Sequence, residues 1–224
     1  MTRTLRFPRG LYGITPEWDD TNRLLQAIEQ AAAGGLVALQ WRRKKIPHHQ
    51  RLTQAQAVVD HCRALGVISI INDDWQLALQ TGADGAHLGR DDGQLALARK
   101  ALGPDRYLGA SCYNELERAR SALSHGVDYI AFGAVYPSLI KPDAVAADLA
   151  LFTQATALVQ SMRQGQARAA IVAIGGISPD NLAPVIAAGA DSAALISSLF
   201  NAQDIRAVAK QCQQIFIGQL NEQS

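Results

Sequence analysis

The segment Ala170–Asp180, which reads AIVAIGGISPD, contains one complete transition from a strand to a helix. Its first five residues are apolar and rich in β-branched side chains, which is typical of a buried strand in a parallel sheet. Two glycines then turn the chain. Ser178 followed by Pro179 has the chemistry of a helix N-cap with proline in the first turn. The segment therefore predicts a strand, a tight turn and a helix, in that order.

The same order recurs along the whole chain. Helical periodicity is clearest over Thr21–Ala33 and Ala55–Leu65, and glycines close several of the helical stretches. Strand and helix alternating eight times predict the α/β class and a single (β/α)8 TIM barrel. The predicted strands are Leu11–Thr15, Leu36–Arg42, Val67–Asn72, Gly85–Gly89, Tyr107–Cys112, Tyr129–Val135, Ala170–Gly176 and Ser192–Ser197.

A doubly wound open sheet is the competing architecture, since eight βα units also fit there. Its usual fingerprint, GxGxxG after the first strand, is missing, because Gly10-Leu11-Tyr12-Gly13 does not match it. The 224 residues also contain no linker at which the chain could be divided. We therefore predict one TIM-barrel domain over residues 1–224, with a core from about residue 10 to residue 218.

The charge balance narrows the classes of function. The chain has 21 basic and 20 acidic side chains, so it lacks the basic excess of a protein that grips nucleic acid. It also has no apolar run long enough to cross a bilayer, which predicts no membrane partner. Three distant cysteines, Cys62, Cys112 and Cys212, suit neither zinc nor a disulfide framework, and they favour a cytoplasmic location. Association into a homo-oligomer stays open.

Catalysis in a TIM barrel takes place at the carboxyl ends of the strands. The second predicted strand ends in Gln40-Trp41-Arg42-Arg43-Lys44-Lys45. With a side-chain period of two, Gln40, Arg42 and Lys44 share one face, which places an amide and two cations at the mouth. A solvated loop is the alternative interpretation of this basic run. The apolar strand that leads directly into it favours a phosphate site.

Acidic residues follow the next two strands. Asp73 and Asp74 end the third strand, and Asp91 and Asp92 follow the fourth. One aspartate of the first pair is expected to cap the next helix. Like charges at one mouth repel unless a cation lies between them, and Mg²⁺ binds one or two carboxylates together with phosphate oxygens. The two pairs together predict a magnesium site.

The last two strands end in residues suited to an anion. Gly175 and Gly176 follow the seventh strand, and Ile196 and Ser197 end the eighth. Paired glycines before a helix let backbone N–H groups close on a phosphate, which TIM barrels often bind after these strands. A tight turn that requires glycine is the alternative. The histidines have no ligand spacing, so none is expected to bind metal.

These residues resemble the thiamine phosphate synthase family, also called thiamine-phosphate pyrophosphorylase. The matching segments occur in family order from about residue 10 to residue 210, so the resemblance covers almost the whole chain. They are Leu39–Lys44, Ile71–Asp74, Gly82–Gly89, Gly109–Ser111, Phe132–Ser138 with Lys141, Val172–Ile177 and the strand ending at Ser197.

The resemblance implies a transferase that joins two thiamine precursors. The diphosphate of an aminohydroxymethylpyrimidine loses pyrophosphate, and the nitrogen of hydroxyethylthiazole phosphate takes its place. Mg²⁺ would be held by Asp73 and Asp92, and the catalytic residues would be Ser111, Lys141 and Arg42. The pyrimidine diphosphate would contact Gln40, Trp41, Arg42, Arg43, Lys44, Asn72, Ser111 and Lys141; the thiazole phosphate would contact Ser138, Leu139, Ile140, Gly175, Gly176, Ile196 and Ser197.

Two departures from the family pattern define the alternatives. Tyr113 and its neighbours lack the histidine that follows Ser111 in many members, and Ile140 stands where the family usually has threonine. An isomerase similar to the thiazole tautomerase branch would need that histidine for proton transfer. A non-catalytic barrel that binds thiamine intermediates is favoured only by Ile140, which removes one hydroxyl from the predicted phosphate site.

Overall fold

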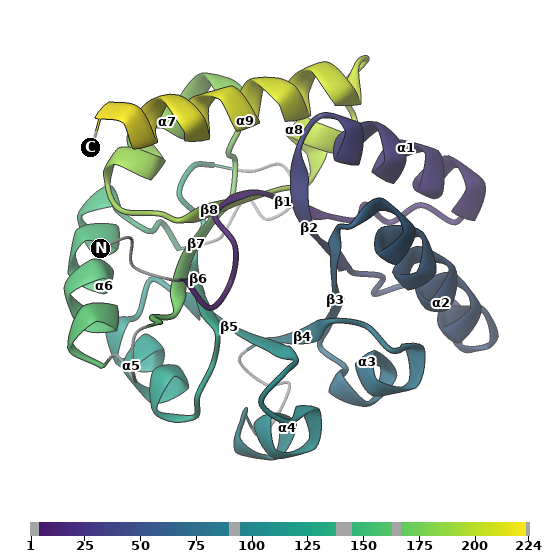
Figure 1. Cartoon of the computed structure of the whole chain (residues 1–224), viewed down its shortest axis with the longest axis horizontal. Coiled ribbons are helices and arrows are strands. Elements are labelled where there is room, and N and C mark those ends of the chain that lie inside the picture. The colour runs from purple at the N-terminus through teal and green to yellow at the C-terminus, as the bar shows by residue number, and fades with distance from the viewer. Residues whose placement is uncertain (1–4, 90–94, 138–144, 163–166, 223–224) are drawn as a thin grey trace.

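The strands form a closed parallel barrel in chain order, with β1 hydrogen-bonded to both β2 and β8. A computed structural model describes residues 5–89, 95–137, 145–162 and 167–222. All eight predicted strands are present, which confirms the (β/α)8 architecture, and Figure 1 shows the helices outside the ring of strands. The strands are β1 (Gly10–Ile14), β2 (Leu36–Trp41), β3 (Ile68–Asn72), β4 (Gly85–Leu88), β5 (Tyr107–Tyr113), β6 (Tyr129–Phe132), β7 (Ala170–Ile174) and β8 (Ser192–Leu195).

Each of the helices α1 to α7 follows the strand of the same number, and α8 and α9 both follow β8. Ser178 and Pro179 begin α7 as predicted, through a capping box. Helix α2 begins at His48 rather than at the predicted Ala55, because its polar first turns face solvent and lack an apolar period. The helices are α1 (Thr21–Ala33), α2 (His48–Leu65), α3 (Trp75–Thr81), α4 (Leu95–Leu102), α5 (Leu116–Ser124), α6 (Leu149–Ser161), α7 (Pro179–Ala187), α8 (Ser197–Phe200) and α9 (Ile205–Glu222).

Apolar side chains form two separate layers, one inside the barrel and one between the barrel and the helices. Alternate residues of a strand enter different layers: Leu11 packs outside and Tyr12 inside. Phe7, which precedes β1, is fully buried with its ring centroid 4.3 Å from that of Tyr129 and 5.3 Å from that of Tyr12. Aromatic rings therefore fill the amino-terminal end of the barrel.

A Gly-x-Asp sequence precedes three of the strands, β4, β6 and β8. Its glycine has a positive φ at the end of the preceding helix, and its aspartate accepts a backbone N–H from the strand before. Each carboxylate thereby fixes the register between two neighbouring strands. The three contacts are Asp84 with Ser69 N at 2.7 Å, Asp128 with Leu108 N at 2.7 Å and Asp191 with Ile171 N at 2.9 Å.

Two of these aspartates are buried and are compensated by arginine. Asp191 is 1% exposed and accepts from both guanidinium nitrogens of Arg168, at 2.7 and 2.8 Å, and from Arg9 at 3.0 Å. Asp128 is bound by two further arginines at 2.5 and 2.8 Å. Burial raises the pKa of Asp128, and the hydrogen bond from a backbone N–H together with the two cations opposes that shift.

The three cysteines are free and buried. Burial raises the pKa of the Cys62 and Cys112 thiols to about 12 and that of Cys212 to about 11. Within the ranges that the structure describes, they form no disulfide and belong to no metal-binding group of His, Cys, Asp or Glu.

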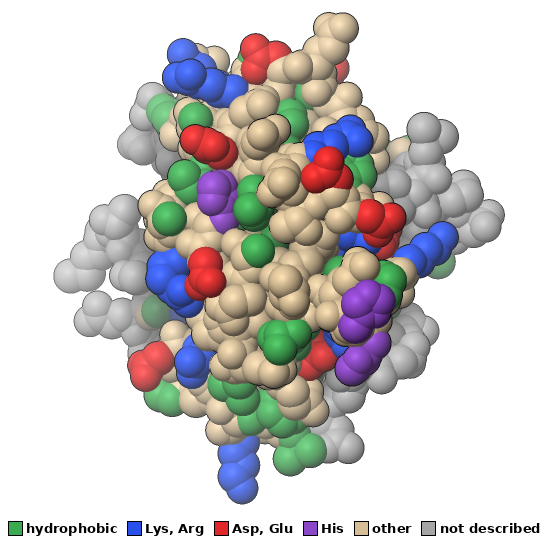
Figure 2. Space-filling view, turned by 90° about the vertical axis from the view of Figure 1, so that its right-hand side faces the viewer, with side chains coloured by type: hydrophobic (Ala, Val, Ile, Leu, Met, Phe, Trp, Pro, Cys, Tyr) green, Lys and Arg blue, Asp and Glu red, His purple; other side chains and the backbone are tan. Residues whose placement is uncertain are grey.

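Acidic and basic side chains are interspersed over the face that Figure 2 shows, with apolar side chains scattered between them. This agrees with the balanced charge of the chain, which is +1 at neutral pH. None of the helices in the described part of the chain is long and apolar enough to cross a membrane.

Replacing Asp191 by alanine should lower the free energy of unfolding by about 3–5 kcal/mol, because it leaves a largely buried guanidinium and a buried backbone N–H without their acceptor. The exposed carboxylate of Asp84 makes the same kind of strand contact, so Asp84→Ala should cost only about 1 kcal/mol. Urea denaturation followed by circular dichroism measures both variants. Equal losses in the two would contradict this account of the Gly-x-Asp contacts.

Candidate active site

A cavity of about 670 Å³ lies at the carboxyl ends of the strands, which is the catalytic end of a TIM barrel. Residues from all eight strands or the loops that follow them contribute to its lining. Apolar side chains such as Ile14, Val172 and Ile174 form part of the wall. The polar side chains that line it include Gln40, Arg42, Lys44, Asn72, Asp73, His87, Ser111, Glu115 and Ser197.

Strand β2 and the residues after it deliver an amide and two cations to this cavity, as the period of two predicts. Gln40 lies inside the barrel and is 3% exposed. Arg42 follows at the rim, with Nη1 3.6 Å from Glu17 Oε1. Lys44 is half exposed, and its Nζ lies 3.9 Å from Asp73 Oδ2. Two cations, each beside a carboxylate, therefore lie at adjoining strand ends, and Asp73 is the carboxylate of the two that also lines the cavity.

The side chains of Trp41 and Arg43 do not line the cavity, so their contact with the pyrimidine diphosphate stays a prediction from the family resemblance. Successive residues of a strand point to opposite faces, and these two face the outer layer. The indole of Trp41 is buried there and donates to Gln54 Oε1 at 3.3 Å. The family motif runs through all of residues 39–44, but only alternate side chains of it line the cavity.

Arg43 instead ties together three parts of the structure. Its side chain is 1% exposed; it donates to Asp19 Oδ1 at 2.6 Å, to Gln54 Oε1 at 2.9 Å and to the carbonyl oxygen of Trp18. Glu17 Oε2 lies 3.3 Å from Nε. The guanidinium thus holds the loop after β1 against α2, beside the cavity rather than in it.

The end of β3 carries the acidic part of the site. Asp74 is the helix cap that the sequence predicts, since its Oδ1 accepts from Leu77 N at 2.8 Å. Asp73 lines the cavity and has a φ of 62°, and its N–H donates to His87 O at 2.8 Å.

Backbone strain in the described residues is concentrated at this cavity. Asp73 and Tyr113 are the two non-glycine residues with positive φ in the part of the chain that the structure describes, and both line the cavity. Such conformations are costly for residues with a Cβ and cluster at functional sites. The strain supports a functional role for this end of the barrel.

Several predicted site residues lie outside the described residues. These are Asp92, Ser138, Leu139, Ile140 and Lys141. Among the residues that the structure does describe, no three His, Cys, Asp or Glu side chains form a metal-binding group. Asp73 is therefore the one predicted magnesium ligand whose position the described part of the structure gives.

Gly175 and Gly176 are required by the turn after β7. Their φ values are 103° and 62°. A Cβ on Gly175 would lie 2.5 Å from Ala134 Cα, and one on Gly176 would lie 2.5 Å from Pro137 O. The tight-turn interpretation is therefore correct, and it is compatible with a phosphate site because both glycines also line the cavity.

The end of β8 completes this side of the cavity. Ile196 and Ser197 both line it, and Ser197 is the first residue of the short helix α8. The first N–H groups of a helix have no acceptor within the helix. Ser198 Oγ donates to Ile177 O at 2.6 Å, which ties this turn to the one after β7.

The floor of the cavity contains a hydrogen-bonded chain of five side chains that sequence reasoning missed. Gln40 Nε2 donates to Tyr12 Oη at 2.9 Å, and Tyr12 Oη lies 2.9 Å from Tyr129 Oη. Tyr129 Oη lies 3.1 Å from His87 Nδ1, and His87 Nε2 lies 2.8 Å from Ser111 Oγ. Burial raises the pKa of both tyrosines, so both phenols are protonated.

The signal for this floor was present in the sequence. Tyr12, Gln40 and His87 lie in separate strands at positions that alternate with outward-facing apolar residues. Polar atoms inside a barrel need partners. Tyrosines in a strand nevertheless fit an apolar layer equally well, so the pattern alone does not separate the two roles.

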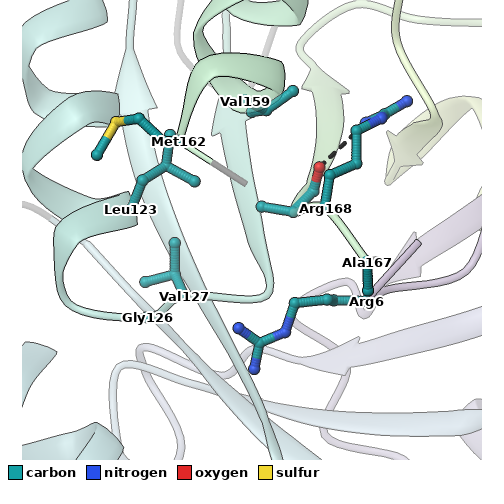
Figure 3. Close-up of a pocket in the computed structure, with 9 residues that line it drawn as sticks. Arg6, Leu123, Gly126, Val127, Val159, Met162, Ala167 and Arg168 are labelled. Atoms are coloured by element: carbon teal, nitrogen blue, oxygen red, sulfur yellow. Dashed lines mark hydrogen bonds between the residues drawn. The ribbon is translucent and has the colours of Figure 1, made fainter. Parts of the chain in front are cut away.

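A second pocket lies at the opposite, amino-terminal end of β6 and β7, and Figure 3 shows its lining. Its volume of about 30 Å³ is too small for an organic substrate. Its two arginines are engaged elsewhere: Arg6 pairs with Asp128 at 2.8 Å and Arg168 pairs with Asp191 at 2.7 Å. The larger cavity is therefore the candidate active site.

Comparison with known proteins gives one consistent family. The model described as thiamine monophosphate synthase matches residues 11–199. The chain is 59% identical to the thiamine-phosphate synthase of Bordetella avium, over 93% of this chain and 95% of that protein. It is 52% identical to the thiamine-phosphate synthase of Methylobacillus flagellatus, again over 93% of this chain and 95% of that protein.

Solved structures agree with these sequences. The thiamine phosphate pyrophosphorylase from Pyrococcus furiosus is 29% identical and superposes with a TM-score of 0.80, covering 95% of this chain and 98% of that one. A 3-hexulose-6-phosphate synthase from Salmonella typhimurium is 14% identical, with a TM-score of 0.67 over 92% of this chain and 98% of that one. The second similarity shows the shared fold alone.

The opposite directions of Arg42 and Arg43 predict opposite effects of truncation. Arg43→Ala should lower the free energy of unfolding by about 2 kcal/mol, because it removes hydrogen bonds from a buried cation to charged and neutral acceptors. Arg42→Ala should leave stability within about 0.5 kcal/mol of the parent, since its side chain lies at the rim. Thermal and urea unfolding of the pair would refute the assignment if Arg42→Ala proved the more destabilising.

Proposed function

We propose how this chain, which belongs to the thiamine monophosphate synthase family, holds the two substrates of its reaction. The chain is a transferase of thiamine synthesis, which joins the pyrimidine diphosphate to the thiazole phosphate and releases pyrophosphate. The carbon–oxygen bond of the pyrimidine substrate breaks, and its electron pair leaves with pyrophosphate. The thiazole nitrogen gives its lone pair to the same carbon. The electron-rich aminopyrimidine ring stabilises that carbon while the bond breaks.

The pyrimidine diphosphate lies along the side of the cavity formed by β2, β3 and β5. The observation that carries this placement is that Arg42, Lys44 and Asp73 line the same side of the cavity, with Lys44 paired to Asp73. Two cations there match a diphosphate, whose negative charge grows as it leaves. Lys141, outside the described residues, is proposed as a third. Gln40 and Ser111, on the floor of the cavity, contact the pyrimidine ring in this arrangement. Asn72 lies between the ring and the diphosphate.

Magnesium is the metal that the family resemblance implies, and the donor set of this cavity fits it. Asp73 offers carboxylate oxygens at the rim, with 27% of its side chain exposed. Magnesium takes one or two protein carboxylates and completes its shell with water and phosphate oxygens, so Asp73 together with Asp92 would hold it. When bound, the ion supplies positive charge to the diphosphate oxygens.

The thiazole phosphate lies on the other side, at the turns after β7 and β8. Support comes from the backbone at Gly176 and Ser197, which borders the cavity without bulky side chains. Gly175 and Ile196 flank these two residues. Ser138, Leu139 and Ile140, which lie outside the described residues, are proposed to contact the same phosphate.

The protein's own residues have little proton transfer to perform in this reaction. They hold departing charge with Arg42 and Lys44, and they bring the two substrates together in one cavity, where proximity supplies much of the rate. Ile14, Val172 and Ile174 give the cavity an apolar wall that keeps water from the electron-poor carbon. These roles do not favour the isomerase alternative, because the isomerase reaction requires a proton-transfer group such as the histidine that is missing after Ser111.

We also propose that the reaction takes place in the cytoplasm, with small-molecule substrates, without a nucleic-acid or membrane partner, and with a homo-oligomer as an open possibility. The three free, buried thiols support a reducing compartment. On the face that Figure 2 shows, acidic and basic side chains are mixed, and the chain as a whole lacks a basic excess, which supports small molecules over nucleic acid.

Asp73→Asn should lower kcat/KM for the pyrimidine diphosphate by about 100-fold or more at saturating magnesium, since a carboxylate on the metal is replaced by a neutral amide. Asp60→Asn is the matched control, because Asp60 is exposed on α2 and, among the described residues, pairs with Arg63 and Gln56 of its own helix. Initial rates of thiamine phosphate formation and pyrophosphate release measure both variants.

Product from the parent protein with both substrates and magnesium is the required baseline. Binding of both substrates without turnover would favour the non-catalytic alternative. Parent-like turnover of Asp73→Asn across a magnesium titration would remove Asp73 from the metal site.

A further inference from the structure

The hydrogen-bonded chain on the cavity floor has a limited supply of protons. Each tyrosine hydroxyl, the serine hydroxyl and a neutral imidazole has one proton to donate. Tyr12 accepts from Gln40, and Tyr129 is the acceptor that the described side chains offer for the proton of Tyr12, so this direction has Tyr12 donating to Tyr129. Tyr129 then gives its proton to His87 Nδ1. The donor-to-acceptor direction of the hydrogen bond at Gln40 thereby sets the direction of every following hydrogen bond up to Ser111.

The direction determines the tautomer of His87. In the neutral imidazole, an Nδ1 that accepts from Tyr129 leaves the proton on Nε2, which then donates to Ser111 Oγ. Ser111 has then accepted a hydrogen bond inside the barrel and retains its own proton for the cavity, where its side chain is partly exposed. At the opposite end, Gln40 uses Nε2 inside the barrel, which leaves Oε1 for the cavity.

We propose that this buried chain fixes the polarity of the cavity floor, with Ser111 as a hydrogen-bond donor to the substrate and Gln40 as an acceptor. Tyr12, Tyr129 and His87 are positioning residues, which act on the substrate through the two end groups. Tyr12, Tyr129, His87 and Gln40 are each at most 6% exposed, so water does not compete for the hydrogen bonds among these four side chains.

The opposite direction would invert both ends together. It requires the amide of Gln40 to turn so that Oε1 accepts from Tyr12. In each of the following hydrogen bonds, up to the one between His87 and Ser111, the donor and the acceptor are then exchanged. Ser111 would donate to His87 and offer the cavity only an acceptor. A mixture of the two directions leaves two donors or two acceptors facing each other in the barrel, which is costly for buried groups. The raised pKa values of the two tyrosines exclude a phenolate that could bridge such a defect.

A fixed polarity selects one class of pyrimidine. This step rests on the proposed function, in which Gln40 and Ser111 contact the pyrimidine ring. An aminopyrimidine offers an amino N–H to Gln40 and a ring nitrogen to Ser111. The same ring with an oxo group in place of the amino group offers an acceptor and a ring N–H instead, so both contacts are mismatched. The floor therefore favours the amino form over its oxo analogue.

The tautomer of His87 tests the direction of the hydrogen-bonded side chains on the cavity floor without any substrate. Two-bond ¹H–¹⁵N correlation spectra of the labelled protein distinguish the neutral Nε2–H and Nδ1–H forms, and His87→Gln identifies the His87 signals among the five histidines. We expect the Nε2–H form in the parent protein and a mixture of forms in Tyr129→Phe. An Nδ1–H form or an imidazolium in the parent would overturn the proposal, even if the enzyme were active.

Competition between the aminopyrimidine diphosphate and its oxo analogue tests whether the floor selects the amino form. The parent should prefer the amino diphosphate over its oxo analogue by about a thousandfold or more in kcat/KM, since sites built to hydrogen-bond a substrate strongly reject a mismatched one. Tyr129→Phe should reduce this preference by about tenfold. Tyr107→Phe is the matched control, because Tyr107 also packs on Phe7 but its hydroxyl makes no hydrogen bond to the described residues. An equal reduction in Tyr107→Phe would overturn the assignment.

Two replacements of His87 separate positioning from packing. Glutamine keeps an amide N–H near the place of Nε2, whereas asparagine keeps an amide oxygen near Nδ1. His87→Gln should retain more of the preference for the amino substrate than His87→Asn, and equal preferences would contradict a donor role toward Ser111. A parent enzyme that forms no product would defeat the proposed function, while the His87 tautomer would still decide the polarity.

Discussion

Closure of the sheet through the pairing of β1 with β8 is the constraint on which the rest of the structure depends. A closed parallel sheet brings eight carboxyl ends to one rim, so residues as distant in sequence as Arg42 and Ser197 line one cavity. The three Gly-x-Asp contacts stabilise the closed sheet at the amino-terminal ends of the strands, because each aspartate fixes one strand against its neighbour. Phe7 fills that end, and the carboxyl end is left for chemistry.

The closed barrel also divides each strand into an inner and an outer face with different tasks. On β2, Gln40 and Arg42 belong to the cavity, while Trp41 and Arg43 secure the outer layer and the loop after β1. Inside the barrel, the buried polar side chains Tyr12, Gln40, Tyr129 and His87 hydrogen-bond to one another and to Ser111. The chain from Gln40 to Ser111 follows from that isolation, and it gives the floor a direction that no single side chain would have.

Much of the fold could be predicted because buried parallel strands are almost continuous in apolar residues. The limits were physical. The first turns of α2 are solvated and show no period, and the Gly-x-Asp aspartates resemble ordinary loop residues until their strand partners are known. In the site, the side-chain period of two correctly predicts that Gln40 faces the cavity and Trp41 faces away from it. The family motif, taken as one continuous segment, does not distinguish the two. Tyr12 and Tyr129 fit an apolar layer by composition, so only the register of the closed barrel shows that their hydroxyls meet.

The central claim is that the floor holds the pyrimidine ring in one orientation while the rim holds its diphosphate. A crystal structure with magnesium and a pyrimidine diphosphate analogue whose leaving oxygen is replaced by methylene tests this most directly. The account predicts the amino group on Gln40 Oε1, a ring nitrogen on Ser111 Oγ, and the diphosphate against Arg42 and Lys44. A ring bound in the reverse orientation, or a diphosphate seated at Gly176 and Ser197, would contradict it.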